Sequence, residues 1–330
     1  FGPTTLGTAP CQDVGRNEFD VAGNRSLLTK NGETTYYSYD TLNQLTRTES
    51  TQGALSYYTY QADGALETKH DAEGWAYYDW DVDEALLRVT RVGATTGQAT
   101  ELYDADMKRV ARDLDGTATY YTFDGEKIAR IDQPEAGYRD FYVQEGPSIY
   151  SPLVSVHDEA ADANYWYLFD ALGSTMGLVD VNGNLTGKLQ YDAFGNVLGE
   201  TNVPRSAFFK YVGAYQYMPE DFEDMMLLWH RWYDAAASVF ASDDALPDMP
   251  WLGQAYALAT PTTYVDPTGH SCHLLWPGPP HYTWKYFPRV PVTPWTLGPV
   301  TQGSWTPGAL DLIVNIVGGT IGPWGPLNPG

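Results

Sequence analysis

The sequence predicts an all-β fold: a solenoid of coiled, stacked β-hairpins followed by an extended C-terminal segment rich in proline and tryptophan. Three observations predict it. The 330 residues include 25 Tyr and 11 Trp, side chains that favour strands over helices. The chain also contains 32 Gly and 22 Pro, so its turns must be frequent. An aromatic–aspartate pair returns at intervals near 20 residues, which is enough for two strands and their turns.

The repeat consists of an aromatic residue followed by aspartate, or once by glutamine. Successive pairs lie 20, 21, 20, 23 and 20 residues apart, and two later pairs lie 22 apart. They are Phe19-Asp20, Tyr39-Asp40, Tyr60-Gln61, Trp80-Asp81, Tyr103-Asp104, Phe123-Asp124, Phe169-Asp170 and Tyr191-Asp192. A fixed period of this kind indicates one supersecondary unit stacked many times. At this period the first 269 residues would hold about thirteen hairpins, enough for a partial spiral.

Aromatic residues also keep fixed positions within each unit. Tyr37 and Tyr39 are two residues apart, as are Tyr58 and Tyr60, so each pair lies on one face of its strand. Tyr36 falls on the opposite face. We expect the rings of consecutive units to stack into ladders, each contact adding roughly 0.5–1.5 kcal/mol beyond simple burial.

Each pair is followed by a turn that contains glycine or asparagine, such as Gly23-Asn24 and Gly195-Asn196. These residues tolerate the positive φ angles that tight turns require. We interpret the aspartates, for example Asp40 and Asp192, as residues whose carboxylates accept backbone N–H groups at the corner between strand and turn. The repeat aromatics and aspartates are therefore predicted to be structural.

The net charge of −23 comes from 19 basic and 42 acidic residues. Residues 270–330 contain only two basic and one acidic residue, so the acidity belongs to the first 269. Such a surface repels nucleic acid and anionic membranes, and we predict no nucleic-acid partner. The most apolar stretch, residues 309–324, is too short and too often interrupted to be a transmembrane segment.

The pattern Tyr-x-Tyr-Asp-x-x-Gly-Asn-x-Leu at this spacing resembles the tyrosine-aspartate (YD) repeats of Rhs and teneurin-like proteins. The best copies are residues 167–174 and 189–198, and the first is similar to the D-x-L-G-S block of the Rhs-associated core. The resemblance implies hairpins that coil into a hollow β-shell able to enclose a polypeptide. We divide the chain into an N-terminal segment 1–12, a YD-repeat coil 13–150, an Rhs-associated core 151–269 and a tail 270–330.

The end of the predicted core resembles the closing part of the Rhs core. Residues 227–234 are similar to the family's YYYRARYYD strand, residues 240–244 to RFLSQDP, and residues 264–269 to YVDPTG. In toxin-bearing members this end carries an aspartyl autoprotease that cuts just beyond Asp-Pro-x-Gly. The resemblance implies that Asp266 is a catalytic carboxylate, with Asp243 or Asp244 as its partner and Arg231 nearby.

Several positions depart from the family pattern. His270 stands where an apolar residue usually follows the glycine, and Ala245 replaces the proline after the acidic pair. Residues 270–330 are also still attached in this sequence. We therefore expect self-cleavage to be absent or slow, with residues 266–269 acting as a turn that closes the core.

The tail differs in composition from the rest of the chain. Residues 270–330 hold 11 of the 22 prolines and 5 of the 11 tryptophans. The five are Trp276, Trp284, Trp295, Trp305 and Trp324. A toxin domain occupies this position in polymorphic Rhs toxins, but this tail has no nucleophile–base constellation. We interpret it as an assembly tail that links subunits, with a plug inside its own shell as the alternative.

Two classes of function remain open, and a third is a glycan-binding adhesin. One is an extracellular structural protein, secreted or on the cell surface, that self-assembles into a shell, tube or fibre. The other is the C-terminal shell piece of an Rhs-type toxin-delivery protein with aspartyl self-cleavage. We expect a homo-oligomer or polymer, with glycans as a further class of partner. No cofactor and no metal are predicted, because His270, Cys272 and His273 lack the regular spacing of a zinc site.

Overall fold

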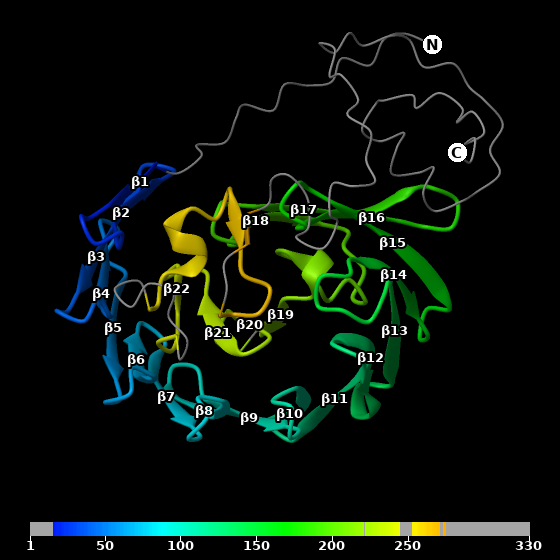
Figure 1. Ribbon diagram of the computed structural model, residues 1–330, viewed down its shortest axis with the longest axis horizontal. Coiled ribbons are helices and arrows are strands. Elements are labelled where there is room, and N and C mark those ends of the chain that lie inside the picture. Colours follow the sequence, from blue (N-terminus) through cyan, green and yellow to red (C-terminus); the bar gives the residue numbers. More distant parts are fainter. Residues whose placement is uncertain (1–15, 221, 245–252, 271–272, 275–330) are drawn as a thin grey trace, which may run out of the picture. The chain divides into compact units, whose positions relative to one another are not determined.

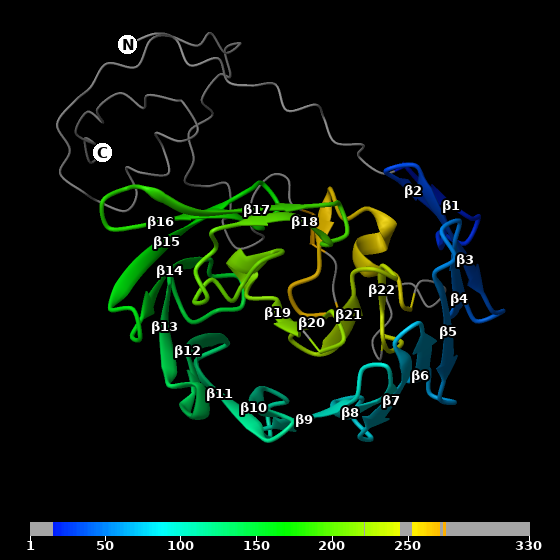
Figure 2. The same ribbon diagram turned by 180° about the vertical axis from the view of Figure 1, so that it is seen from behind.

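The computed structural model describes residues 16–220, 222–244, 253–270 and 273–274. Within these ranges the regular elements are β-strands and short 3-10 turns, so the all-β prediction is confirmed. The chain forms an 18-stranded antiparallel sheet, called here the wall, from residues 16–201. The described residues between 202 and 270 follow it and form the central segment, around which the wall curves (Figures 1 and 2).

The wall is a meander in which each strand pairs antiparallel with the next one along the chain. Its strands are β1 Arg16–Phe19, β2 Arg25–Lys30, β3 Glu33–Tyr39, β4 Leu45–Ser50, β5 Leu55–Tyr60, β6 Leu66–Asp71, β7 Gly74–Trp80, β8 Leu86–Gly93, β9 Gly97–Tyr103, β10 Arg109–Leu114, β11 Thr117–Asp124, β12 Lys127–Gln133, β13 Tyr138–Gln144, β14 Leu153–Asp158, β15 Ala163–Phe169, β16 Thr175–Val179, β17 Leu185–Tyr191 and β18 Val197–Thr201. One 3-10 turn, η1 Pro134–Ala136, lies between β12 and β13.

The central segment carries a four-stranded sheet and a short hairpin. Its elements are η2 Gly213–Tyr215, β19 Met218–Glu220, β20 Met225–Leu228, β21 Arg231–Asp234, β22 Val239–Phe240, η4 Tyr256–Ala259 and β23 Tyr264–Val265, and β23 pairs with β24 His273–Leu274. Figure 1 shows these elements inside the curve of the wall.

The curvature of the wall has a local cause in the repeat. The antiparallel register shifts by one residue at the repeat aromatic, for example between Ser38 and Tyr39 and between Asp79 and Trp80. Such a bulge bends its strand and increases the local twist. Because the bulge returns with the repeat, the bending accumulates along the meander.

The alternation of buried and exposed aromatics follows the predicted faces. Tyr37 is buried on the inner face, whereas its neighbour Tyr36 is 49% exposed on the outer face. The inner rings form one core with the central segment, which contributes Trp232 and Leu227 among others. The core therefore lies between the wall and the chain it surrounds.

The structure differs from two expectations about the repeat. The meander ends at Thr201, after 18 strands, and the chain then folds inward instead of adding hairpins up to residue 269. The expected ring ladders are replaced by contacts with the central segment, such as Tyr142 to Phe209 with centroids 5.0 Å apart. Equivalent strands of consecutive units are separated by a strand, roughly 10 Å in all, which is too far for ring contact.

Candidate functional site

The repeat aspartates lie at the corners between strand and turn. Oδ1 of Asp40 accepts the backbone N–H groups of Leu42 at 2.8 Å and of Gln44 at 3.0 Å. The same pair of bonds occurs at Asp20, Asp81, Asp104, Asp170, Asp180 and Asp192. Asp124 is different, because it pairs within the hairpin with Lys127 across a two-residue turn.

The repeat aromatics are partly buried and pack against the core. They are Tyr39, Tyr60, Trp80, Tyr103, Phe123, Phe169 and Tyr191. Two of them also join consecutive hairpins, since Tyr39 donates its hydroxyl to the carbonyl of Arg25 at 3.1 Å. Trp80 donates Nε1–H to the carbonyl of Leu66 at 2.7 Å. Both bonds reach 14 residues back along the chain.

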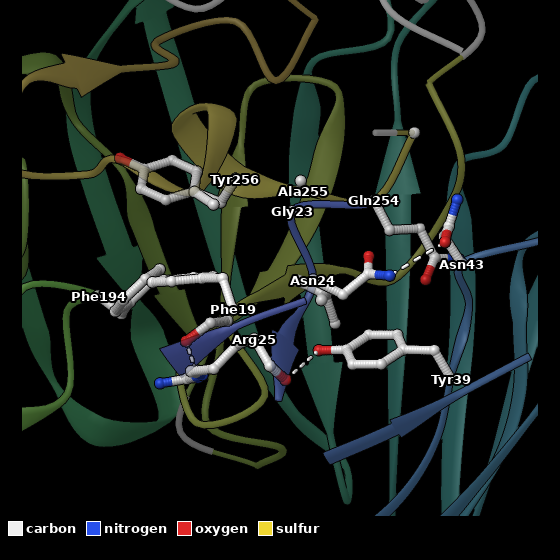
Figure 3. A pocket seen from close by; sticks show the side chains of 14 residues that line it. Phe19, Gly23, Asn24, Arg25, Tyr39, Asn43, Phe194, Gln254, Ala255 and Tyr256 are labelled. Carbon is white, nitrogen blue, oxygen red and sulfur yellow. Dashed lines mark hydrogen bonds between the residues drawn. The ribbon is translucent and has the colours of Figure 1, made fainter. Parts of the chain in front are cut away.

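A small cavity lies where the first hairpin meets the central segment (Figure 3). Its volume of about 20 Å³ is enough for roughly one water molecule. Arg25 borders it, with its guanidinium carbon 4.6 Å from the ring centre of Tyr37 and 4.7 Å from that of Phe194. Its Nη2 also donates to the carbonyl of Ala236 at 3.1 Å. The cavity lies at the contact between the wall and the central segment. Its volume is far smaller than that of a small-molecule binding site.

The residues predicted for self-cleavage come together around Arg231 at the start of β21. Its buried guanidinium lies between two carboxylates, with Nη2 3.1 Å from Oδ2 of Asp244 and 3.7 Å from Oδ2 of Asp266. Nη1 donates to the carbonyl of Gly253 at 2.7 Å, and Nε donates to the carbonyl of Gly269. One cation therefore contacts both carboxylates and the peptide carbonyl at the expected cleavage position.

The closing turn is fixed by its own hydrogen bonds. The N–H of buried Asp266 donates to the hydroxyl of Tyr217 at 3.0 Å. Thr268 donates its hydroxyl to Oδ1 of Asp266 at 3.3 Å and accepts the N–H of His270 at 3.2 Å. Gly269 has a φ of +77°, and a Cβ there would lie 2.6 Å from the carbonyl oxygen of Leu228, so both backbone and space require glycine.

The side chain of His270 contacts the group of residues around Arg231. Its Nδ1 lies 2.9 Å from Oδ1 of Asp244, and its ring stacks on that of His230 with centroids 4.9 Å apart. Burial, together with the neighbouring His270, lowers the pKa of His230 to about 4, so His230 is neutral at physiological pH. The residue that departs from the family pattern thus contacts one of the two carboxylates.

The partner of Asp266 at Arg231 is Asp244. The carboxylate of Asp243 instead approaches Gly64 and Gly253, because a Cβ on either glycine would contact it. Burial raises the pKa of Asp243, opposed by a hydrogen bond from Gln254 and by the positive charge of Arg231. The sequence did not distinguish Asp243 from Asp244 as the partner of Asp266. In the structure the two side chains point toward different groups.

This arrangement suits hydrolysis of the peptide bond that follows Gly269. Two carboxylates can divide the roles of general base and general acid. A guanidinium on the carbonyl oxygen can stabilise the negative charge that develops there during attack by water.

Other buried charges have no counterpart in the sequence prediction. Arg91 of β8 bonds Glu223, and Arg109 of β10 contacts Glu101 and Glu220. Lys127 is 1% exposed, and among the described residues its Nζ has no hydrogen-bond partner. For Arg91, Arg109 and Lys127, the signal in the sequence was a charged residue within a predicted strand, at a position where an apolar side chain is expected.

The chain is similar to tRNA nuclease WapA of Bacillus subtilis, with 27% identity over 268 residues that cover 78% of this chain and 11% of that protein. It is 28% identical over 272 residues to the tRNA3(Ser)-specific nuclease WapA of Bacillus spizizenii, with the same coverage. The chain thus spans about a tenth of the length of these relatives. No family model matches the chain.

Among solved structures, the chain is similar to a TcdB2-TccC3-Cdc42 crystal structure, with a TM-score of 0.47, 14% identity, and coverage of 77% of this chain and 17% of that one. A second is the Photorhabdus luminescens Tc holotoxin pore, with a TM-score of 0.43, 15% identity, and coverage of 78% and 16%.

The five tryptophans of the predicted assembly tail, Trp276, Trp284, Trp295, Trp305 and Trp324, lie outside the described residues, as does Cys272. In the part of the chain that the structure describes, no helix has the length and apolar character needed to cross a membrane.

Proposed function

We propose that this chain is the C-terminal part of the shell of a secreted or cell-surface Rhs-type toxin-delivery protein, and that it cleaves itself after Gly269. The similarity to WapA nucleases supports this over the self-assembling fibre, for which neither relatives nor fold provide support. The WapA relatives are named as nucleases of tRNA, and the chain matches about a tenth of each. The nuclease activity is not part of the proposal.

The contact of Arg231 with Gly269 carries the proposal. A turn that merely closed the core would need no buried cation on its carbonyl, because backbone N–H groups satisfy most turns. Here Nε of Arg231 donates to that carbonyl, while Nη2 of the same side chain faces Asp244 and Asp266. This combination is more specific to a peptide-cleaving site than the sequence motif alone.

In the proposed reaction, water attacks the carbonyl carbon of Gly269 and loses a proton to one carboxylate. Arg231 stabilises the negative charge on the carbonyl oxygen. The bond to the nitrogen of His270 then breaks, and that nitrogen takes a proton from the second carboxyl group. Water is the only co-reactant, and the products are a new C-terminus at Gly269 and a new N-terminus at His270. This proposal replaces the expectation that self-cleavage is absent or slow, and the contacts of Arg231 with Asp244, Asp266 and Gly269 support it.

Intact mass spectrometry of the purified chain during incubation tests the proposal. We expect a fragment that ends at Gly269 to accumulate in the wild type, and to be lost in Asp266→Asn and in Asp244→Asn. Asp243→Asn is the matched control, because its carboxylate lies against Gly64 and Gly253, whereas the ion pairs of Arg231 are with Asp244 and Asp266. Thermal unfolding of each variant verifies that it is folded.

Persistence of the same cut in Asp266→Asn would show that another protease makes it. Absence of the cut in a folded wild-type chain across pH 4–8 would restore the view that residues 266–269 only close the core. Loss of cleavage in Asp243→Asn, with cleavage retained in Asp244→Asn, would show that Asp243 and not Asp244 is the partner of Asp266.

A further inference from the structure

Thr268 occupies the variable position of the Asp-Pro-x-Gly turn, and its hydroxyl contacts two of the groups that the proposed cleavage uses. It donates to Oδ1 of Asp266 at 3.3 Å and accepts the N–H of His270 at 3.2 Å. The nitrogen of His270 is the one that leaves when the bond after Gly269 is cut. The hydroxyl therefore stands between a buried carboxyl group and the departing nitrogen.

The two carboxylates do not stand in equivalent positions relative to that nitrogen. Both carboxylates face Arg231 through Oδ2, but Oδ1 of Asp244 lies against the imidazole of His270 and not against its backbone nitrogen. Asp266 is buried at 1% exposure, and its Oδ1 reaches the backbone nitrogen of His270 through Thr268. Asp266 is therefore the carboxyl group with a hydrogen-bonded path to the leaving nitrogen.

We propose that Thr268 is a catalytic hydroxyl that relays the proton from Asp266 to the nitrogen of His270; this rests on the proposed self-cleavage. As the carbon–nitrogen bond breaks, the electron pair remains on nitrogen. Asp266 enters this step as the protonated acid, and both hydrogen bonds of the turn reverse their direction. Asp266 gives its proton to Thr268, whose own hydroxyl proton passes to the lone pair of that nitrogen. Asp244 receives the proton of the attacking water, so the reaction consumes one water and no other reagent.

A side chain that only shaped the turn would behave differently from a relay. Valine has nearly the same shape as threonine without the hydroxyl, and serine keeps the hydroxyl without the methyl group. We expect Thr268→Val to slow cleavage by about 100-fold or more, the lower end of the range of general acid–base effects, and Thr268→Ser to retain most of the wild-type rate. Thr263→Val, at an exposed position of the same closing region, is the matched control.

Cleavage rates are measured by intact mass spectrometry from pH 4 to pH 8, together with thermal unfolding. A Thr268→Val chain that cleaves at the wild-type rate, or a Thr268→Ser chain that fails like valine, overturns the relay and leaves self-cleavage standing. A wild type that shows no cleavage overturns the proposed function and the relay with it. Slow Thr268→Val with active Thr268→Ser and unchanged melting temperatures supports the relay.

Discussion

Arg91 of the wall and Glu223 of the central segment form a buried ion pair across 132 positions of sequence, with Nε and Oε1 2.7 Å apart. Their side chains are 4% and 1% exposed. Tyr78 donates its hydroxyl to the same carboxylate at 2.9 Å, and Arg91 also bonds Asp71. The pair fixes the central segment against β8.

Removing one partner leaves the other charge buried without compensation. We expect Arg91→Met to lower the free energy of unfolding by roughly 3–5 kcal/mol. Arg91→Met with Glu223→Gln should recover part of the loss, because glutamine is neutral and still accepts from Tyr78. Urea unfolding measures both.

Arg88 offers the control for this experiment on the same strand. It pairs with Asp79 at 2.9 Å, but both side chains are about half exposed, so Arg88→Met should cost roughly 0–1 kcal/mol. Equal losses for the Arg88 and Arg91 variants would mean that the buried pair does not hold the central segment.

Lys127 is predicted to destabilise the folded chain at neutral pH. Burial lowers its pKa from 10.5 to about 7, so the folded state prefers the neutral amine and the unfolded chain the charged one. The destabilisation of the folded state by Lys127 is therefore largest below pH 7, falls between pH 7 and 10.5, and disappears above pH 10.5. At neutral pH it is on the order of 4 kcal/mol, from 1.36 kcal/mol for each pKa unit.

We accordingly expect Lys127→Met to be more stable than the wild type at pH 7, with a difference that shrinks as the pH approaches 10.5. Thermal or urea unfolding at several pH values measures this difference. A gap that stays constant with pH would show that Lys127 keeps its proton on folding. Lys108→Met is a useful comparison, because Nζ of Lys108 donates to the carbonyl of Gly125 at 3.0 Å.

The repeat aspartates should differ according to their turns. Asp40→Ala removes an acceptor of two backbone N–H groups, and we expect a loss of roughly 0.5–2 kcal/mol, as for a helix cap. Asp124→Ala should cost less, because Asp124 lies in a two-residue hairpin. Urea unfolding of both variants tests the difference. Equal losses in the free energy of unfolding would show that the hydrogen bonds of the Asp40 carboxylate do not stabilise its turn.

Gly53 and Gly64 allow backbone strain to be separated from crowding. Their φ angles are nearly equal, +92° and +94°. A Cβ on Gly53 meets nothing within 4 Å, whereas one on Gly64 would lie 2.4 Å from Oδ2 of Asp243. We expect Gly53→Ala to lose about 1 kcal/mol from strain alone and Gly64→Ala to lose more by displacing Asp243. Similar melting temperatures for the two variants would contradict the packing of Asp243 against this turn.

The wall could be predicted because its strands and turns depend on residues that are close together in the sequence. The spacing of Tyr39, Tyr60 and Trp80, and the glycines after them, determine strands, turns and inward faces without reference to distant residues. The same local rules placed Tyr37 inside and Tyr36 outside. They could not indicate where the meander ends, because the strand signal continues past Thr201 into a segment that folds inward.

The sequence by itself determined the all-β repeat and the group of residues from which the candidate site is built. Only the tertiary structure decided that Asp244 and not Asp243 faces Arg231, that His270 contacts Asp244, and that Arg91 meets Glu223. Adjacent residues such as Asp243 and Asp244 point in opposite directions on an extended chain, so the choice depends on how β21, the closing turn and the wall pack. That packing brings together side chains that are far apart in sequence, and local propensity carries no information about such distances.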